Sequence, residues 1–134
     1  MYKITNQPVL RTICFQMSGM LTEQEVHQLE RETRRIVDTY RGKAHLVFAD
    51  MRGLRPASPP VAEIMQRIIS YCRRHGTMCC VHLSDIAITQ LQAARLARQA
   101  TRNLDGTLTI DVATAQEAEQ VLKEQRNYLW ERCA

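Results

Sequence analysis

The chain has 134 residues, of which 45% are hydrophobic and 24% are charged. These proportions are those of a globular domain, so they exclude a disordered, collagen-like or coiled-coil chain, and the length predicts a single domain over residues 1–134. The 18 Lys and Arg residues against 14 Asp and Glu residues give a mildly basic net charge of +4.

Cysteine usage and the amino-terminal residues bear on the cellular compartment. The five cysteines are an odd number, which does not suit a closed set of disulfides. The first residues contain no apolar run of signal-peptide length, and no stretch approaches the roughly 18 apolar residues of a membrane span. The sequence therefore predicts free thiols, no membrane span and a cytoplasmic location.

Hydrophobic periodicity and capping signals divide the chain into alternating strands and helices. Apolar residues alternate over 9–17, as in a strand, and recur at helical spacing from Val26 to Tyr40. Thr22 and Glu25 form a capping box before that helix. The expected elements are strands at 2–5 and 9–17, a helix from Thr22 to Gly42, a strand at 44–49, a helix from Ser58 to Gly76, a strand at 78–83, a helix from Ser84 to about Arg102, a turn at 103–106, a strand at 107–112, and a helix from Thr114 to about Trp130.

The same periodicity predicts which faces are buried. The first helix should expose its charged face, which comprises Glu30, Arg31, Arg34 and Arg35. The strand at 107–112 should point Leu108, Ile110 and Val112 inward and Thr107, Thr109 and Asp111 outward, as an edge strand does.

The element order β-β-α-β-α-β-α-β-α predicts the fold class. A strand pair followed by repeated crossovers gives an α/β fold with a mixed, mainly parallel five-stranded sheet and about four helices. In such sheets ligands and partners meet the carboxyl ends of the strands. Here that edge comprises residues 50–60, 84–87 and 111–114.

Three segments resemble the STAS family, the domain of sulfate transporters and anti-sigma-factor antagonists. They read FQMSGMLTEQEVHQL, LVFADMRGL before a Ser/Pro helix start, and LDGTLTIDVATAQEAEQVL. The chain is most similar to the divergent branch related to the sporulation anti-anti-sigma factor. The resemblance implies helices packed mainly on one side of the sheet and a role in protein recognition.

The same resemblance implies a switch by serine phosphorylation at the start of the second helix. Asp50 matches the aspartate at the end of the family's central strand. The family's Asp-Ser-Ser-Gly element falls on residues 57–60, where Ser58 is the hydroxyl residue and the glycine is absent. Ser58 is therefore the phosphorylation candidate.

Two groups of polar residues at the strand ends have alternative interpretations. Ser58 could carry a phosphate or contact an anion at a helix N-terminus, or it could cap the helix. Asp50, Ser84 and Asp85 could converge to hold a partner's arginine or a metal. Alternatively, Asp50 satisfies the turn that follows it and Ser84 or Asp85 caps the third helix.

Other chemistry-bearing residues favour structural roles. Cys79 and Cys80 are adjacent in a strand and face opposite sides, so with Cys72, His75 and His82 they do not match a zinc site. We expect no metal and no cofactor. The sequence has no catalytic or nucleotide-binding motif. Aromatic residues do not interleave its arginine stripes, which are Arg31-Arg34-Arg35 and Arg95-Arg98-Arg102, and this disfavours nucleic-acid binding.

The sequence thus predicts a non-enzymatic regulatory module that binds a protein partner. The expected binding residues are Asp50, Arg52, Arg55, Ser58, Ser84 and Asp85. The alternative is a small-molecule carrier or an enzyme that uses the same edge, for which a closed apolar cavity of several hundred cubic ångströms would be the indication. A homodimer could form through the strand at 107–112 or through a helix face.

Overall fold

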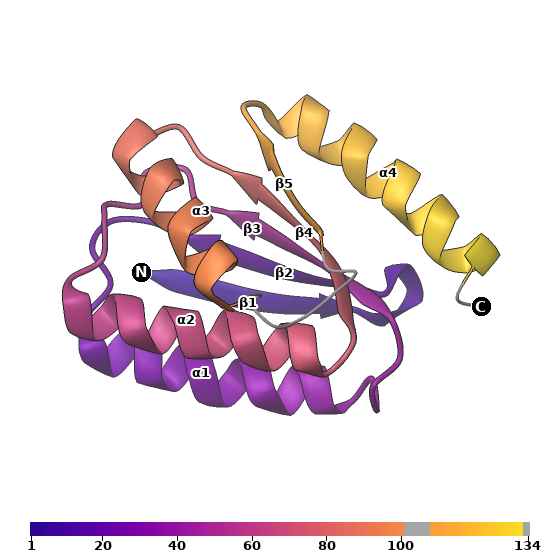
Figure 1. Ribbon diagram of the computed structural model, residues 1–134, viewed down its shortest axis with the longest axis horizontal. Coiled ribbons are helices and arrows are strands. Elements are labelled where there is room, and N and C mark those ends of the chain that lie inside the picture. Colours follow the sequence, from indigo (N-terminus) through magenta and orange to yellow (C-terminus); the bar gives the residue numbers. More distant parts are fainter. Residues whose placement is uncertain (101–107, 133–134) are drawn as a thin grey trace.

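The chain begins with a hairpin, in which β1 (Tyr2–Gln7) pairs antiparallel with β2 (Thr12–Met17). The structure is a computed structural model that describes residues 1–100 and 108–132. The elements that follow are α1 (Glu23–Asp38), β3 (His45–Asp50), α2 (Pro59–Arg74), β4 (Thr77–Leu83), α3 (Ala87–Ala100), β5 (Leu108–Val112) and α4 (Ala115–Arg132). This order confirms the predicted α/β fold class (Figure 1).

The five strands form one mixed sheet in the order β1-β2-β3-β4-β5. Each pair from β2 to β5 is parallel. The carboxyl ends of these four strands therefore lie at one edge of the sheet, where the loops into α1, α2, α3 and α4 begin.

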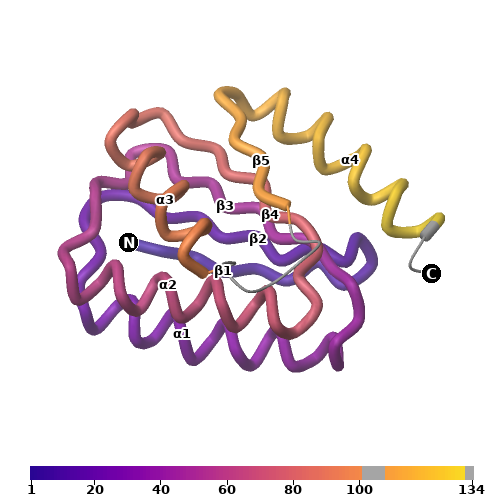
Figure 2. Tube along the Cα trace, in the orientation of Figure 1, coloured from indigo at the N-terminus to yellow at the C-terminus, as the bar shows by residue number. Residues whose placement is uncertain are grey.

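Helices cover both faces of the sheet (Figures 1 and 2). α1 and α2 lie side by side on one face, and α3 packs along α2. α4 crosses the other face over β3, β4 and β5. Ile13 and Val26 belong to the core under α1 and α2, and Leu46 and Leu122 belong to the core under α4. Among the described helices, none combines the length and apolarity needed to cross a bilayer.

Capping side chains fix where the helices begin. The capping box at α1 is confirmed, because Glu25 N donates to Thr22 Oγ1 and Thr22 N donates to Glu25 Oε1, both at 3.1 Å. At α4, Glu117 N donates to Thr114 Oγ1 at 3.1 Å. The Glu117 carboxylate reaches one residue further back than a capping box requires and accepts from Ala113 N at 3.3 Å.

The predicted strand at 9–17 begins three residues too early. Pro8–Leu10 form a 3₁₀ turn, Arg11 adopts a left-handed φ of 47°, and β2 begins at Thr12. The alternation places Val9 on the same face as Ile13, but Val9 is 86% exposed whereas Ile13 is buried. The reversal between two antiparallel strands needs these residues, and alternation of apolar residues does not reveal where the reversal ends.

The predicted solvated face of α1 is wrong at Glu30, which is buried. Its carboxylate accepts from Arg67 Nε at 2.9 Å and from Arg67 Nη2 at 2.8 Å, across the seam between α1 and α2. Arg34 also contacts Glu30 at 3.5 Å and lies 4.6 Å over the Tyr71 ring. The packing of α2 against α1 thus buries part of the charged face of α1.

The predicted orientation of β5 is only partly right. Val112 is buried as expected, but Leu108 is 47% exposed. Thr109 accepts a hydrogen bond from Arg73 of α2, and Asp111 lies 3.8 Å from the His82 ring. The α2 side of β5 is therefore a polar contact surface. The predicted turn at 103–106, Arg102 and Thr107 lie outside the described residues.

Candidate functional site

Three loops meet at the carboxyl ends of the parallel strands. The loop after β2 joins the loop after β3, because Gly19 N donates to Gly53 O at 2.9 Å and Arg55 N donates to Gly19 O at 2.8 Å. Gly19 and Leu54 form an isolated parallel bridge between the two loops. We call residues 18–22, 50–58 and 84–87, together with Thr89 and Gln92, the strand-end rim.

Side chains at the start of α3 hold the loop after β3 in place. Asp85 Oδ1 accepts from Gly53 N at 2.8 Å. Thr89 Oγ1 donates to Leu54 O at 2.6 Å. Gln92 bonds the backbone of Ala57 twice: Oε1 accepts from Ala57 N at 2.8 Å and Nε2 donates to Ala57 O at 3.0 Å. The loop is thus attached to α3 along most of its length.

The sequence pattern does not predict Thr89 and Gln92 as rim residues. They lie three residues apart, followed four residues later by the buried Leu96, so they occupy the inner face of α3. Polar side chains on an otherwise apolar helix face are the signal that could have revealed them. Their partners are 35 residues away in the chain, and spacing alone could not identify them.

Asp50 binds an arginine of its own loop. Arg52 Nε and Nη2 donate to the two Asp50 oxygens at 3.0 and 2.8 Å, and Arg52 N donates at 3.2 Å. These bonds from Arg52 lower the pKa of Asp50, against the opposing effect of burial. The Asp50 carboxylate, and more weakly that of Asp85, raises the pKa of Arg52. Arg52 therefore connects the two carboxylates electrostatically.

Ser84 and Ser58 differ sharply in exposure. Ser84 is buried, and its hydroxyl contacts the backbone of Ile86 at 3.3 and 3.4 Å in a local turn. Ser58 is exposed and occupies the N-cap position of α2, but its side chain makes no capping bond. Pro59 and Pro60 lack the N–H group, so two of the donors that begin a helix are absent here.

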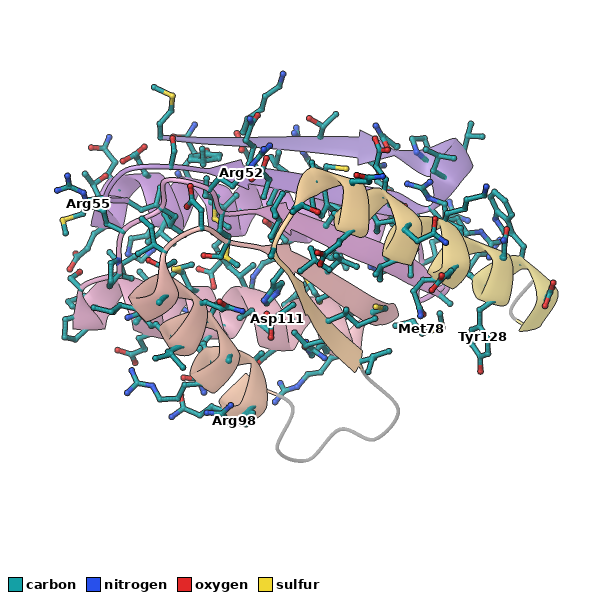
Figure 3. All side chains as sticks on the ribbon, turned by 90° about the horizontal axis from the view of Figure 1, so that it is seen from above. Arg52, Arg55, Met78, Arg98, Asp111 and Tyr128 are labelled. Atoms are coloured by element: carbon teal, nitrogen blue, oxygen red, sulfur yellow. The ribbon has the colours of Figure 1, made fainter. Side chains whose placement is uncertain are left out.

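Arg55 is the second exposed arginine of the rim. Its backbone N–H holds Gly19, while its side chain extends into solvent. Figure 3 shows Arg52 and Arg55 projecting from the loop after β3, with Asp111 further along the sheet. The structure thus brings Arg52, Arg55, Ser58 and Asp85 to one surface, but it leaves Ser84 beneath that surface.

A small cavity lies in the apolar core next to the rim. A cavity of about 70 Å³ lies between the sheet and the helices, with Phe15, Met65 and Leu96 among its lining residues. Pockets for small organic ligands usually measure about 300 Å³ or more. An open groove of about 300 Å³ also runs past the Asp50–Arg52 pair on the sheet surface, beside Lys3 and Gln16.

The cysteine and histidine residues lie on different sides of the sheet. Cys80 belongs to the core under α1 and α2, and Cys79 belongs to the core under α4, as strand alternation predicts. Burial raises the pKa of Cys72 to about 12 and lowers the pKa of His82 to about 4. Within residues 1–100 and 108–132 no three His, Cys, Asp or Glu side chains gather as a metal site would need.

Comparison with known proteins defines the fold. No family model matches the chain, and no curated protein matches it. Among solved structures, the chain is similar to the crystal structure of an uncharacterized protein from the DUF3478 family with a SpoIIAA-like fold, from Shewanella loihica PV-4. The TM-score is 0.67 at 13% sequence identity, over 91% of this chain and 92% of that chain. The chain therefore has a SpoIIAA-like fold, and the resemblance drawn from its sequence is confirmed at that level.

Proposed function

We propose that the chain is a non-enzymatic regulatory module that binds a protein partner through the strand-end rim. The observation that carries the proposal is the contrast between the rim's backbone and its side chains. The backbone of residues 53–57 is held by Gly19, Asp85, Thr89 and Gln92, while the side chains of Arg55 and Ser58 are exposed. A rigid loop with exposed polar side chains suits recognition, because little ordering entropy is lost on binding.

The polar residues of the rim divide into contacts and supports. In this proposal Arg52, Arg55 and Ser58 touch the partner. Asp50 orients the Arg52 guanidinium, and Asp85 holds the Gly53 backbone, so these two carboxylates act through their neighbours. Ser84 shapes the turn before α3 and does not reach the partner, since it is buried.

Ser58 is the proposed site of regulation by phosphorylation. Its hydroxyl is exposed and makes no capping bond, so a kinase could reach it without breaking a helix cap. With prolines at the next two positions, a phosphate here would find fewer backbone N–H donors than helix N-termini usually offer. The added charge would therefore face outward and change what the rim attracts.

Binding of a small molecule is less well supported. The apolar cavity of about 70 Å³ is too small for a typical organic ligand. The groove beside Asp50 and Arg52 is open to solvent and mixes apolar with charged side chains, which suits a surface contact better than retention of a metabolite.

Site-specific photo-cross-linking tests the proposal. A benzophenone amino acid replaces Met20, which is 61% exposed on the rim, or Val9, which is 86% exposed in the β1–β2 turn away from it. We expect a discrete protein to cross-link from position 20 in native lysate and not from position 9. Arg55→Glu should lower the yield by about fivefold or more, a change of about 1 kcal/mol in binding. Lys123→Glu, the same charge change on α4, should not.

The outcomes separate the proposed roles. A change in yield with Ser58→Asp, but not with Ser58→Ala, would support the phosphorylation switch. Equal yields in both variants would contradict it. If no protein cross-links from position 20, the binding role is wrong. A small molecule retained in native mass spectrometry would then favour the carrier alternative.

A further inference from the structure

One side of α3 is exposed and carries aliphatic and basic side chains together. Ile88 and Leu91 are 66% and 71% exposed, and the exposed Arg95 and Arg98 follow at helical spacing. Residues three or four positions apart share a helix face, so these four form one stripe, which we call the outer stripe of α3. Figure 3 shows Arg98 near the C-terminal end of this helix.

The opposite side of α3 is fixed against the protein. Leu96 is buried, Thr89 donates to Leu54 O, and Gln92 bonds the backbone of Ala57 twice. These contacts set the rotation of the helix about its own axis, so Ile88 and Leu91 cannot turn inward. Neighbouring exposed aliphatic side chains next to polar ones are typical of surfaces that bind a partner.

The surroundings of the two aliphatic residues are positively charged. α3 contains no Asp or Glu over its whole length. Arg55 of the rim lines the same small gap as Thr89 and Gln92, so it lies beside the first half of the helix. The acidic side chain just before α3, Asp85, accepts a hydrogen bond from Gly53 N. Arg95 thus follows the aliphatic pair along the helix, and Arg55 lies on the rim side of the helix, next to Thr89 and Gln92.

We propose that the outer stripe of α3, together with Arg55, binds an acidic amphipathic segment of the partner protein. This inference rests on the proposed function, because it names the chemistry of the segment that docks beside the rim. The segment would place apolar side chains on Ile88 and Leu91 and carboxylates on Arg55 and Arg95. The guanidinium fork matches a carboxylate with two parallel hydrogen bonds, which gives such contacts their specificity.

A lipid surface fits these residues less well. A helix that lies in a membrane interface buries a broad apolar face, often with Trp or Phe. The outer stripe offers two aliphatic side chains, because the remaining large apolar residue of α3, Leu96, faces the protein. A peptide segment needs a smaller apolar contact and adds directed carboxylate bonds to it.

Selection from a random peptide library displayed on phage, with the full chain as bait, tests the inference. We expect the enriched peptides to carry Asp or Glu three or four residues from a large apolar residue. Their affinity, measured by fluorescence anisotropy, should fall about tenfold or more with Leu91→Ser and with Arg95→Glu. Both positions are exposed, so these variants should fold normally.

Matched controls make the same changes elsewhere on the surface. Val9→Ser and Lys123→Glu should bind the enriched peptides as the wild type does. Added salt should weaken wild-type binding, because part of the attraction is between exposed charges.

Three results would overturn the inference. The first is that no peptide is enriched, or that the enriched peptides lack acidic residues. The second is unchanged peptide affinity in Leu91→Ser and Arg95→Glu. The third is that the chain binds vesicles of equal parts phosphatidylserine and phosphatidylcholine in preference to the peptides. Cross-linking at position 20 tests the proposed function separately. A partner that cross-links there and binds both α3 variants as well as the wild type would overturn this inference alone.

Discussion

The carboxylate of Asp85 accepts a hydrogen bond from the backbone N–H of Gly53 at 2.8 Å, across 32 positions of sequence. This bond ties the segment that leads into α3 to the loop after β3. It fixes the backbone from which Arg52 and Arg55 project.

Removal of this acceptor should loosen the rim more than it destabilises the fold. Asp85→Ala should lower the free energy of unfolding by about 1 kcal/mol, since the bond is exposed and water can replace it. Amide hydrogen exchange over residues 53–57 should become faster. Asp85→Asn keeps an oxygen acceptor and should restore much of the protection. Unchanged exchange in Asp85→Ala would show that Thr89 and Gln92 hold the loop without it.

The bond between Glu30 and Arg67 should contribute to the stability of the α1–α2 seam. Glu30→Ala leaves the guanidinium of Arg67 without its two bonds to the carboxylate and should cost about 2 kcal/mol in urea unfolding at neutral pH. Glu63→Ala removes an exposed carboxylate of α2 and should cost about 0.5 kcal/mol or less. Equal losses in the two variants would contradict a special role for Glu30.

The same pair predicts a dependence on acid. The bonds from Arg67 lower the pKa of Glu30 in the folded chain below its unfolded value. The stabilisation is therefore complete above the unfolded pKa and is lost as the pH falls through the folded pKa. Glu30→Gln, which carries no charge at any pH, should approach wild-type stability as the solution is made acidic. A constant difference between the two proteins would contradict this sign.

His82 should make the fold less stable in mild acid. Burial lowers its pKa to about 4, while the nearby Asp111 raises it and Arg73 lowers it. Cys80 lies on the same sheet face, and the His82 Nδ1 atom has no hydrogen-bond partner among the described residues. Between the unfolded and folded pKa values, the unfolded chain binds a proton that the folded chain does not. Stability should therefore fall between about pH 7 and pH 4, by up to about 3 kcal/mol.

The variant His82→Gln should flatten this pH dependence. His45, whose pKa burial also lowers, remains in the variant and supplies a smaller slope of the same sign. His45 has both ring nitrogens bonded, to Lys43 O at 2.9 Å and to Thr77 Oγ1 at 2.7 Å. Urea unfolding of the two proteins at several pH values is the measurement. Identical slopes would contradict the assignment to His82.

Gly76 and Gly42 offer a matched pair for backbone strain. Gly76 has a φ of +108°, and an added Cβ would lie 2.6 Å from Lys43 O and 2.8 Å from Gly42 O. Gly42 has a φ of +79° with nothing within 4 Å of an added Cβ. Gly76→Ala should cost at least about 3 kcal/mol, from strain and overlap together, whereas Gly42→Ala should cost about 1 kcal/mol. Thermal unfolding compares them, and equal costs would show that the 2.6 Å contact relaxes easily.

Local signals in the sequence predicted the elements well. The Thr22–Glu25 capping box and the Ser58–Pro59 helix start act over three or four residues, and both helices begin where those signals stand. The strand and helix order then limited the topology to a mainly parallel sheet. The main boundary error, at residues 9–11, arose because a 3₁₀ turn can continue the alternation of a strand.

The sequence by itself determined the order of elements, the capping box of α1 and the edge of the sheet where polar residues gather, because these depend on neighbours along the chain. Only the tertiary structure decided the partners of those residues. Glu30 is buried and accepts hydrogen bonds from Arg67, the Asp85 carboxylate accepts from Gly53 N, and Ser84 is buried. The Arg67 and Gly53 partners lie 37 and 32 positions away, and the packing of one crossover against the next brings them within hydrogen-bonding distance.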